Sequence, residues 1–347
     1  MNGGNGTVSA SESLAVRLLE RGAGAAVTDL MAEANPLGAM LAEVYNFLLG
    51  RDLRWASLYM ELAHRFPFDG FGPANALSRG RTLRLIERRR PDAVVLICPW
   101  IVGPVLGALR LLSGPRPKVY VVVVDLGTGL APSWFNPGVD LTMLPTRQAQ
   151  RWLREHGLDG HPSEVTGMPL SPAVLEQGAP PACLDGLSGP VVTVLGGREG
   201  GRNTLAIADR LLERHLDASI VVQCGKNRAL LRAASRRKGV RAVGFLDSLI
   251  PLMRASSVVV TKPGALTVSE LVALRKPFVL DTWPAVMPQE RGNVQFVREE
   301  RCGLIASRPE DIPPMVESAL DGRRSFSYPE IYGTDRIADI ILKGGAP

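Results

Sequence analysis

Glycine-rich and polar segments follow apolar runs in the second half of this 347-residue chain. The run Val191–Leu195 leads into Gly-Gly-Arg-Glu-Gly-Gly, whose glycines let the backbone wrap closely around a diphosphate or a reacting centre. A later run, Ser219–Gln223, leads into Cys-Gly-Lys-Asn. Glycine-rich turns also occur for steric reasons alone, so neither segment is specific by itself. The candidate donor-binding residues here are Gly197, Arg198, Glu199, Gly200, Lys226 and Asn227.

The most informative segment is Val260–Glu270. Its apolar run ends at Lys262, a Pro-Gly turn follows, and Thr267 and Glu270 fall on the first turns of the helix expected next. Free amides and a Thr hydroxyl at a helix start suit a phosphate, and a carboxylate one turn later suits the two hydroxyls of a ribose. The alternative is a helix with an ordinary N-terminal acid. The segment therefore predicts a nucleotide site that contains Lys262, Gly264, Thr267 and Glu270.

Two further segments agree with a nucleotide-sugar site. Phe245 follows a short strand, where the neighbouring backbone can meet a nucleobase. Pro288–Asn293 is expected to be a polar loop that orients a hexose through Gln289, Glu290 and Asn293. Because ligands bind beyond the carboxyl ends of parallel strands, these loops should converge. The glycine spacings match neither the dinucleotide fingerprint nor the phosphate-binding loop, so NAD and ATP are not favoured.

The positioning elements are strands that alternate with amphipathic stretches, which predicts parallel sheets covered by helices. We expect an α/β fold of two doubly wound domains, residues 1–168 and 189–330, joined by a Pro- and Gly-rich linker at 169–188. Residues 331–347 should form a C-terminal helix that packs back on the first domain. The remaining expected strands are Ala93–Cys98, Val119–Val124, Leu141–Leu144, Ser257–Thr261 and Pro277–Leu280.

Composition limits the compartment and the partners. The four cysteines form no Cys-x-x-Cys pair, which argues against a zinc site or a disulfide framework and favours a cytoplasmic protein. No apolar run approaches the ~20 residues of a membrane-spanning helix, and the N-terminus lacks signal-peptide features. The net charge of +6 is spread over the chain, so nucleic acid is not an expected partner. The densest basic cluster is Arg79, Arg81, Arg84, Arg88, Arg89 and Arg90.

The donor-side segments, in this order and spacing, resemble the monogalactosyldiacylglycerol synthase group, which is akin to bacterial diacylglycerol glucosyltransferases and the N-acetylglucosamine transferase of lipid II synthesis. Asp125–Phe135 and Val165–Pro169 in the first half also look like segments of that group. The resemblance implies a GT-B fold, with two Rossmann-like domains facing across a cleft. It further implies an inverting, metal-independent transferase that uses a UDP-sugar donor. The expected acceptor is a diacylglycerol-like lipid or another hydrophobic molecule. No Asp-x-Asp triplet and no other cofactor motif is present.

The sequence departs from the group where a candidate base is expected. The histidine of the group's first glycine-rich loop aligns with Thr7, or with Asn5 after a one-gap shift, and neither accepts a proton near neutral pH. A second histidine is replaced in the loop at Leu130 and Ala131. Asp125 is then the best remaining base, with a loop-capping aspartate as the alternative. A binding partner without transfer activity and a UDP-sugar 2-epimerase are the other candidate functions.

Two expectations concern the N-terminal half. The apolar and aromatic side chains of Pro36–Phe71 belong either to the core or to a lipid-facing lip, and the Arg79–Arg90 cluster is either a solvated face or a contact with anionic lipid headgroups. A protein peripheral to the inner face of the cell membrane would use both. The glycine-rich start at residues 3–6 lacks a preceding strand, so we expect either a chain started too late or a fold without that strand.

Overall fold

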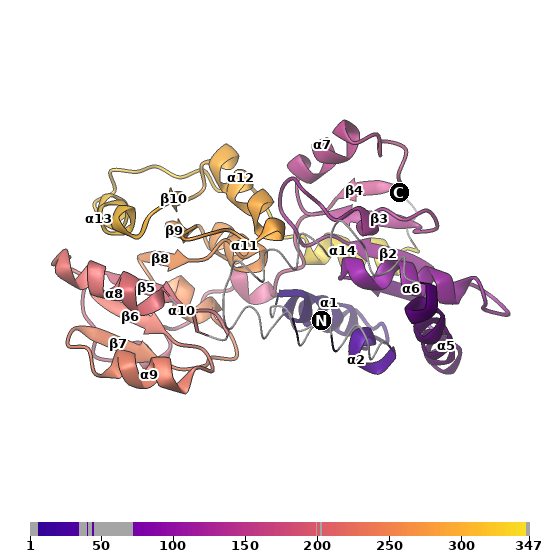
Figure 1. Cartoon of the computed structure of the whole chain (residues 1–347), viewed down its shortest axis with the longest axis horizontal. Helices are drawn as coiled ribbons and strands as arrows, with labels where there is room; N and C mark the ends of the chain where they lie inside the picture. The colour runs from indigo at the N-terminus through magenta and orange to yellow at the C-terminus, as the bar shows by residue number, and fades with distance from the viewer. Residues whose placement is uncertain are drawn as a thin grey trace. The chain divides into compact units, whose positions relative to one another are not determined.

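The computed structural model describes residues 6–34, 40, 44, 72–198, 200–201 and 203–344. The chain divides into two units, the first formed by Met1–Ser171, Met287–Gly292 and Ile331–Pro347 and the second by Pro172–Val286 and Asn293–Glu330. Figure 1 shows a sheet with flanking helices in each unit. All strand pairs are parallel, so the predicted α/β class with two sheets is confirmed.

The described residues of the first unit form a four-stranded sheet in the order β1-β2-β3-β4. Side chains alternate along β2: Val119 and Val121 face a core shared with α5, α6 and α7, whereas Tyr120 and Val122 face α1 and α14. The strands are β1 Ala93–Leu96, β2 Lys118–Val122, β3 Leu141–Leu144 and β4 Ser163–Val165. The helices are α1 Gly6–Glu20, α2 Leu30–Ala34, α5 Gly72–Arg89, α6 Pro99–Leu109, η2 Pro132–Trp134, α7 Arg147–Glu155 and α14 Thr334–Leu342.

The second unit contains a six-stranded sheet in the order β10-β9-β8-β5-β6-β7. One face packs on α8, α9 and α13, and on the other the Ser256 hydroxyl that follows α10 hydrogen-bonds Thr193 of β5. The strands are β5 Val191–Leu195, β6 Ser219–Gln223, β7 Val240–Val243, β8 Val258–Thr261, β9 Phe278–Asp281 and β10 Leu304–Ala306. The helices are η3 Pro172–Val174, η4 Ala182–Leu184, α8 Thr204–Glu213, α9 Arg228–Ser235, α10 Ile250–Ala255, α11 Ala265–Ala273, η5 Pro288–Glu290, α12 Arg291–Glu300, η6 Pro309–Asp311 and α13 Ile312–Leu320.

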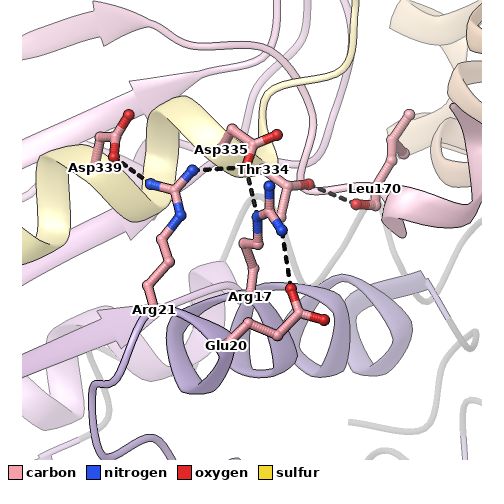
Figure 2. A network of polar contacts seen from close by, with 7 residues as sticks. All are labelled: Arg17, Glu20, Arg21, Leu170, Thr334, Asp335 and Asp339. Atoms are coloured by element: carbon pink, nitrogen blue, oxygen red, sulfur yellow. Dashed lines mark hydrogen bonds and ion pairs between the residues drawn. The ribbon is translucent and has the colours of Figure 1, made fainter.

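The C-terminal helix α14 is tied to α1 within the first unit (Figure 2). Nε of Arg17 and Nη2 of Arg21 donate to the same Asp335 oxygen at 2.5 and 2.7 Å, and Arg21 also pairs with Asp339. Burial raises the pKa of Asp335, but the hydrogen bond from Arg17 and the other donors outweigh it and hold this pKa below its usual value. The network therefore joins two helices that lie more than 300 residues apart in sequence.

The start of α14 and the glycine before it lie against the segment where the chain leaves the first unit. Thr334 Oγ1 donates to the Leu170 carbonyl oxygen at 2.5 Å (Figure 2). A β-carbon at Gly333 would lie 2.3 Å from the Thr166 carbonyl oxygen, so the two backbones touch directly. Only glycine permits this approach.

Candidate functional site

The loops after β5 and β6 pack backbone to backbone. Lys226 N donates to the Arg198 carbonyl oxygen at 2.7 Å, and a β-carbon at Gly225 would lie 2.2 Å from that same oxygen. The backbones of Gly197 and Gly200 have positive φ angles of 71° and 74°, which glycine adopts without strain. The structure therefore brings Gly197, Arg198, Gly200 and Lys226 together, while Glu199 lies outside the described residues.

Asn227 has a structural task in this arrangement. It is the N-cap of α9, and its side-chain oxygen accepts a hydrogen bond from Leu230 N at 2.9 Å. This bond satisfies one of the unpaired amides at the helix start. Its side-chain NH₂ group is the part left for a ligand.

An open pocket of about 380 Å³ lies at the carboxyl ends of β6 and β7. Nζ of Lys226 sits 4.9 Å from the centre of the Phe245 ring, which is 42% exposed. Arg228, in the first turn of α9, adds a second cation to the lining. An aromatic face beside two cations suits a planar group with carbonyl oxygens.

The turn from β8 into α11 leads to Glu270, a buried carboxyl group. Gly264 is the N-cap of α11, so the first amides of this helix have no partner within it. Glu270 lies farther along the helix and is only 9% exposed, and burial raises its pKa to about 8. No hydrogen bond or ion pair reaches its carboxyl group from the described part of the chain. Lys262 is exposed and Thr267 half-buried at the same turn.

The predicted polar loop Pro288–Asn293 is helical, which corrects that expectation: η5 ends at Glu290 and α12 begins at Arg291. Proline at the first position of the turn favours this start because its φ is already helical. Gln289 and Glu290 belong to the first unit, and the other predicted donor residues belong to the second. Asn293 belongs to the second unit, is 1% exposed, and donates to the Pro263 carbonyl oxygen at 2.9 Å.

Asp125 lies at the carboxyl end of β2, in the first unit. Burial raises its pKa to about 6, a hydrogen bond from Trp134 lowers it, and the charge of Glu290 raises it. Nε1 of Trp134 donates to Oδ2 of Asp125 at 3.4 Å. The sequence provides no signal for this contact, because the eight residues between Asp125 and Trp134 form no strand or α-helix.

Thr7 lies in the first turn of α1, where its carbonyl oxygen accepts a hydrogen bond from the Ser11 hydroxyl at 2.7 Å. Within the described ranges no hydrogen bond joins it to Asp125. Gly6 begins the helix, and the rest of the predicted glycine-rich start lies outside the described residues. Cys98 is electrostatically coupled to Asp125, and burial raises the pKa of its thiol to about 11, so the thiol stays protonated.

Trp283 was not anticipated from the sequence. It follows β9 and is 44% exposed, yet its backbone is fixed on both sides. Its N–H donates to Oδ1 of Asp281 at 3.1 Å, and its carbonyl oxygen accepts from Nδ2 of Asn203 at 2.8 Å. Burial raises the pKa of Asp281. An exposed indole on a hydrogen-bonded backbone thus lies at the carboxyl edge of the second sheet.

The described ranges contain neither a metal-binding cluster nor a membrane-spanning helix. No three His, Cys, Asp or Glu side chains gather there closely enough to hold a metal ion. No helix in these ranges has the length and apolar character needed to cross a bilayer.

Both halves of the chain match known family models. The model for monogalactosyldiacylglycerol (MGDG) synthase matches residues 8–170, and the model for the glycosyltransferase family 28 C-terminal domain matches residues 191–321. The chain is 25% identical to monogalactosyldiacylglycerol synthase 1, chloroplastic, of Arabidopsis thaliana over 308 residues, which is 84% of this chain and 57% of the relative. The chain thus spans little more than half the length of that plant relative.

A bacterial relative is covered more fully. The processive diacylglycerol beta-glucosyltransferase of Bacillus subtilis (strain 168) is 26% identical over 336 residues, 92% of this chain and 85% of the relative. Among solved structures, the glycosyltransferase SsfS6 of Streptomyces sp. SF2575 matches with a TM-score of 0.57 and 16% identity over 97% of this chain and 92% of its own.

The MurG structure from Acinetobacter baumannii matches with a TM-score of 0.53 and 18% identity over 78% of each chain. At these identities the structures show the fold, which is GT-B. The two family models account for both halves of the chain, which confirms the resemblance inferred from the motifs. The chain belongs to the glycosyltransferase family that contains the monogalactosyldiacylglycerol synthases and the processive diacylglycerol glucosyltransferases.

Proposed function

We propose that this protein is an inverting, metal-independent hexosyltransferase that moves a hexose from a UDP-sugar to the hydroxyl of a diacylglycerol-like lipid. Family membership supports the reaction class and the lipid acceptor. In the proposed reaction the acceptor oxygen attacks C1 of the sugar while the bond from C1 to the phosphate oxygen breaks. UDP leaves with that electron pair, and the acceptor proton passes to a base.

Glu270 is the observation that carries this proposal. A carboxyl group 9% exposed, without a hydrogen-bond partner among the described residues, costs free energy that a ligand can recover. Such a carboxyl group can accept hydrogen bonds from the two hydroxyls of a ribose. Its position in α11, beyond the carboxyl end of β8, is where nucleotides bind in open parallel sheets.

Groups at the same carboxyl edge of the second sheet would stabilise the negative charge of the leaving UDP. The first amides of α11 have no partner within the helix, and the helix dipole is positive at this end. Together with the glycine-rich loop after β5, they favour binding of an anion. Lys262 and Arg198 add cationic side chains at these two loops. The pocket beside Phe245 and Lys226 would take the uracil, because a carbonyl-rich planar base fits an aromatic face next to a cation.

Asp125 is the proposed base. Its pKa of about 6 is close to neutral, so near pH 7 the group is ionised yet holds a proton better than an ordinary aspartate. Trp134 fixes one carboxyl oxygen by a hydrogen bond and leaves the other to face the acceptor. Thr7 stays a candidate for orienting the acceptor hydroxyl, since a threonine cannot take up its proton.

The membrane surface is the proposed location of the acceptor. All six arginines of the Arg79–Arg90 cluster are exposed, and among the side chains of α5 that the structure describes, Ser78, Thr82 and Ile86 are buried. None of the six forms an ion pair with a described residue. The Pro36–Phe71 stretch lies, apart from Met40 and Val44, outside the described residues. A basic helix face of this kind suits anionic lipid headgroups, which supports a peripheral membrane location.

The test has two steps. Calorimetry with UDP on the whole chain should show binding, and Glu270→Ala should weaken it by about 1–3 kcal/mol because the ribose hydroxyls lose their partner. UDP release should then depend on both a UDP-hexose and diacylglycerol in vesicles. Absence of UDP binding would contradict the proposed donor site. UDP binding without acceptor-dependent release of UDP from the UDP-hexose would favour a binding protein over a transferase.

A further inference from the structure

Two glycines of the first unit bring distant segments into direct backbone contact. A β-carbon at Gly127 would lie 2.2 Å from the Gly292 carbonyl oxygen, and one at Gly292 would lie 2.2 Å from the Thr128 carbonyl oxygen. Neither glycine has a positive φ angle. Glycine is therefore needed at both positions for close approach and not for an unusual backbone conformation.

Each of these segments carries one carboxylate two residues before its glycine. Asp125 precedes Gly127 and Glu290 precedes Gly292. The charge of Glu290 raises the pKa of Asp125, in addition to the larger effect of burial. The contact between the two glycines thus brings together the backbone segments that carry these two carboxylates, which come from opposite halves of the sequence.

Two neighbours of Asp125 do not change their charge near neutral pH. Trp134 of η2 donates a hydrogen bond and does not titrate. Cys98, which follows β1, is coupled to Asp125, but burial keeps its thiol protonated. Among the described residues, Glu290 of η5 is the titratable group whose charge raises the pKa of Asp125.

We infer that Glu290 is a positioning residue for Asp125, held beside it by the contact of Gly127 with Gly292. The inference rests on the proposed function, in which Asp125 takes the acceptor proton. A neighbouring negative charge stabilises the proton that Asp125 accepts, and so makes it a stronger base than a solitary aspartate. In this role Glu290 acts through Asp125, in addition to its predicted contact with the hexose.

The experiment measures the titration of Asp125 itself. In protein carrying ¹³C-labelled aspartate carboxyls, the Asp125 signal is assigned by its loss in Asp125→Asn and followed with pH. Glu290→Gln keeps the side-chain shape and should move this titration to lower pH by several tenths of a unit. Glu299→Gln, on the same helix α12 that follows η5, is the matched control and should leave it unchanged.

A second pair of variants tests the contact without changing either carboxylate. Gly292→Ala should displace the segment and move the Asp125 titration in the same direction. Gly160→Ala adds a β-carbon where nothing lies within 4 Å and should have no effect. An Asp125 titration that Glu290→Gln leaves in place would overturn the inference, whatever the alanine variants do.

Turnover separates this inference from the proposed function. At saturating donor, the acid limb of the kcat profile should move with the titration in Glu290→Gln, and Asp125→Asn should lower kcat by on the order of a hundredfold or more. An Asp125→Asn enzyme with full kcat would remove the base and the inference together. If Asp125→Asn lowers kcat but Glu290→Gln leaves the Asp125 titration unchanged, the inference about Glu290 is overturned and the proposed base is not.

Discussion

The indole Nε1 of Trp134 donates a hydrogen bond to Oδ2 of Asp125 across 3.4 Å, and the Trp134 side chain is fully buried. This bond stabilises the ionised carboxylate and opposes the effect of burial on its pKa. Trp134 therefore limits how far the pKa of the proposed base can rise. It also restricts the orientation of the carboxyl group that meets the acceptor.

Replacing Trp134 by Phe should raise the pKa of Asp125 above its value of about 6, because the hydrogen bond that favours the carboxylate is lost. The acid limb of the kcat profile should move to higher pH, and kcat below pH 6.5 should fall more than kcat at pH 8. Rates at saturating donor over this pH range measure the effect. Trp152→Phe, in α7, is the matched control. A Trp134→Phe profile that overlays the control profile would remove Trp134 from the site.

Glu270 predicts a proton release on UDP binding. Its pKa of about 8 means that the carboxyl group is largely protonated at pH 7, whereas ribose hydroxyls donate to the ionised form. Binding should thus release close to one proton at pH 7 and tighten as pH rises toward 8. Calorimetry in buffers of different ionisation enthalpy counts the protons. Glu270→Gln should abolish the release, and buffer-independent heats in the unchanged protein would contradict the prediction.

The same carboxyl group predicts how the stability of the free protein depends on pH. A carboxyl whose pKa is raised on folding favours the folded state below its ordinary pKa and disfavours it increasingly as pH rises to the folded value, about 8. Glu270 should therefore lower the free energy of unfolding between about pH 4.5 and 8. Glu270→Gln should flatten this decline in denaturant titrations without UDP. A steeper decline in the variant would show that another group is responsible.

The contacts of α14 within the first unit predict two separable effects on stability. Thr334→Val removes the donor to the Leu170 carbonyl oxygen and should cost about 1–3 kcal/mol, because a buried acceptor loses its partner. Asp335→Asn breaks partly exposed ion pairs and should cost about 1 kcal/mol or less, with the loss vanishing at high salt. Denaturant unfolding at two salt concentrations distinguishes them. An Asp335→Asn loss that salt leaves unchanged would point to packing and not to charge.

The sheets could be predicted from the sequence because their central strands are continuous apolar runs. The expected strand Val191–Leu195 matches β5 to the residue, and Ser257–Thr261 differs from β8 by one. Strands β4 and β10 were not anticipated. Each has three residues and lies at the edge of its sheet, so neither forms an apolar run long enough to show periodicity.

The candidate site could be predicted only where local pattern fixes position. Asp125 and Glu270 follow strands of their sheets, and the rule that ligands bind at strand carboxyl ends locates both. The partners of Asp125 come from longer range. Trp134 reaches it across a loop, and Glu290 reaches it through the contact of Gly127 with Gly292, which depends on tertiary packing and leaves no periodic signal.

The basic face of α5 predicts binding to anionic membranes. Arg81, Arg84 and Arg88 lie three and four residues apart on this helix, are exposed, and pair with no carboxylate in the described part of the chain. Because each basic residue near an anionic surface contributes about 1 kcal/mol, replacing all three by Gln should weaken vesicle binding on the order of a hundredfold. Sedimentation with vesicles of rising anionic lipid content measures the partition, and added salt should weaken it as the charges are screened.

The matched control replaces three exposed arginines of α7 by Gln: Arg147, Arg151 and Arg154. It removes the same charge from another helix of the first unit. If the α5 face is the docking surface, the control triple variant should bind vesicles nearly as well as the unchanged protein, since its loss acts only through net charge. Equal losses in both variants would show that binding follows total charge and not the α5 face. If vesicle binding does not change with anionic lipid content, the α5 arginines form a solvated surface and not a membrane contact.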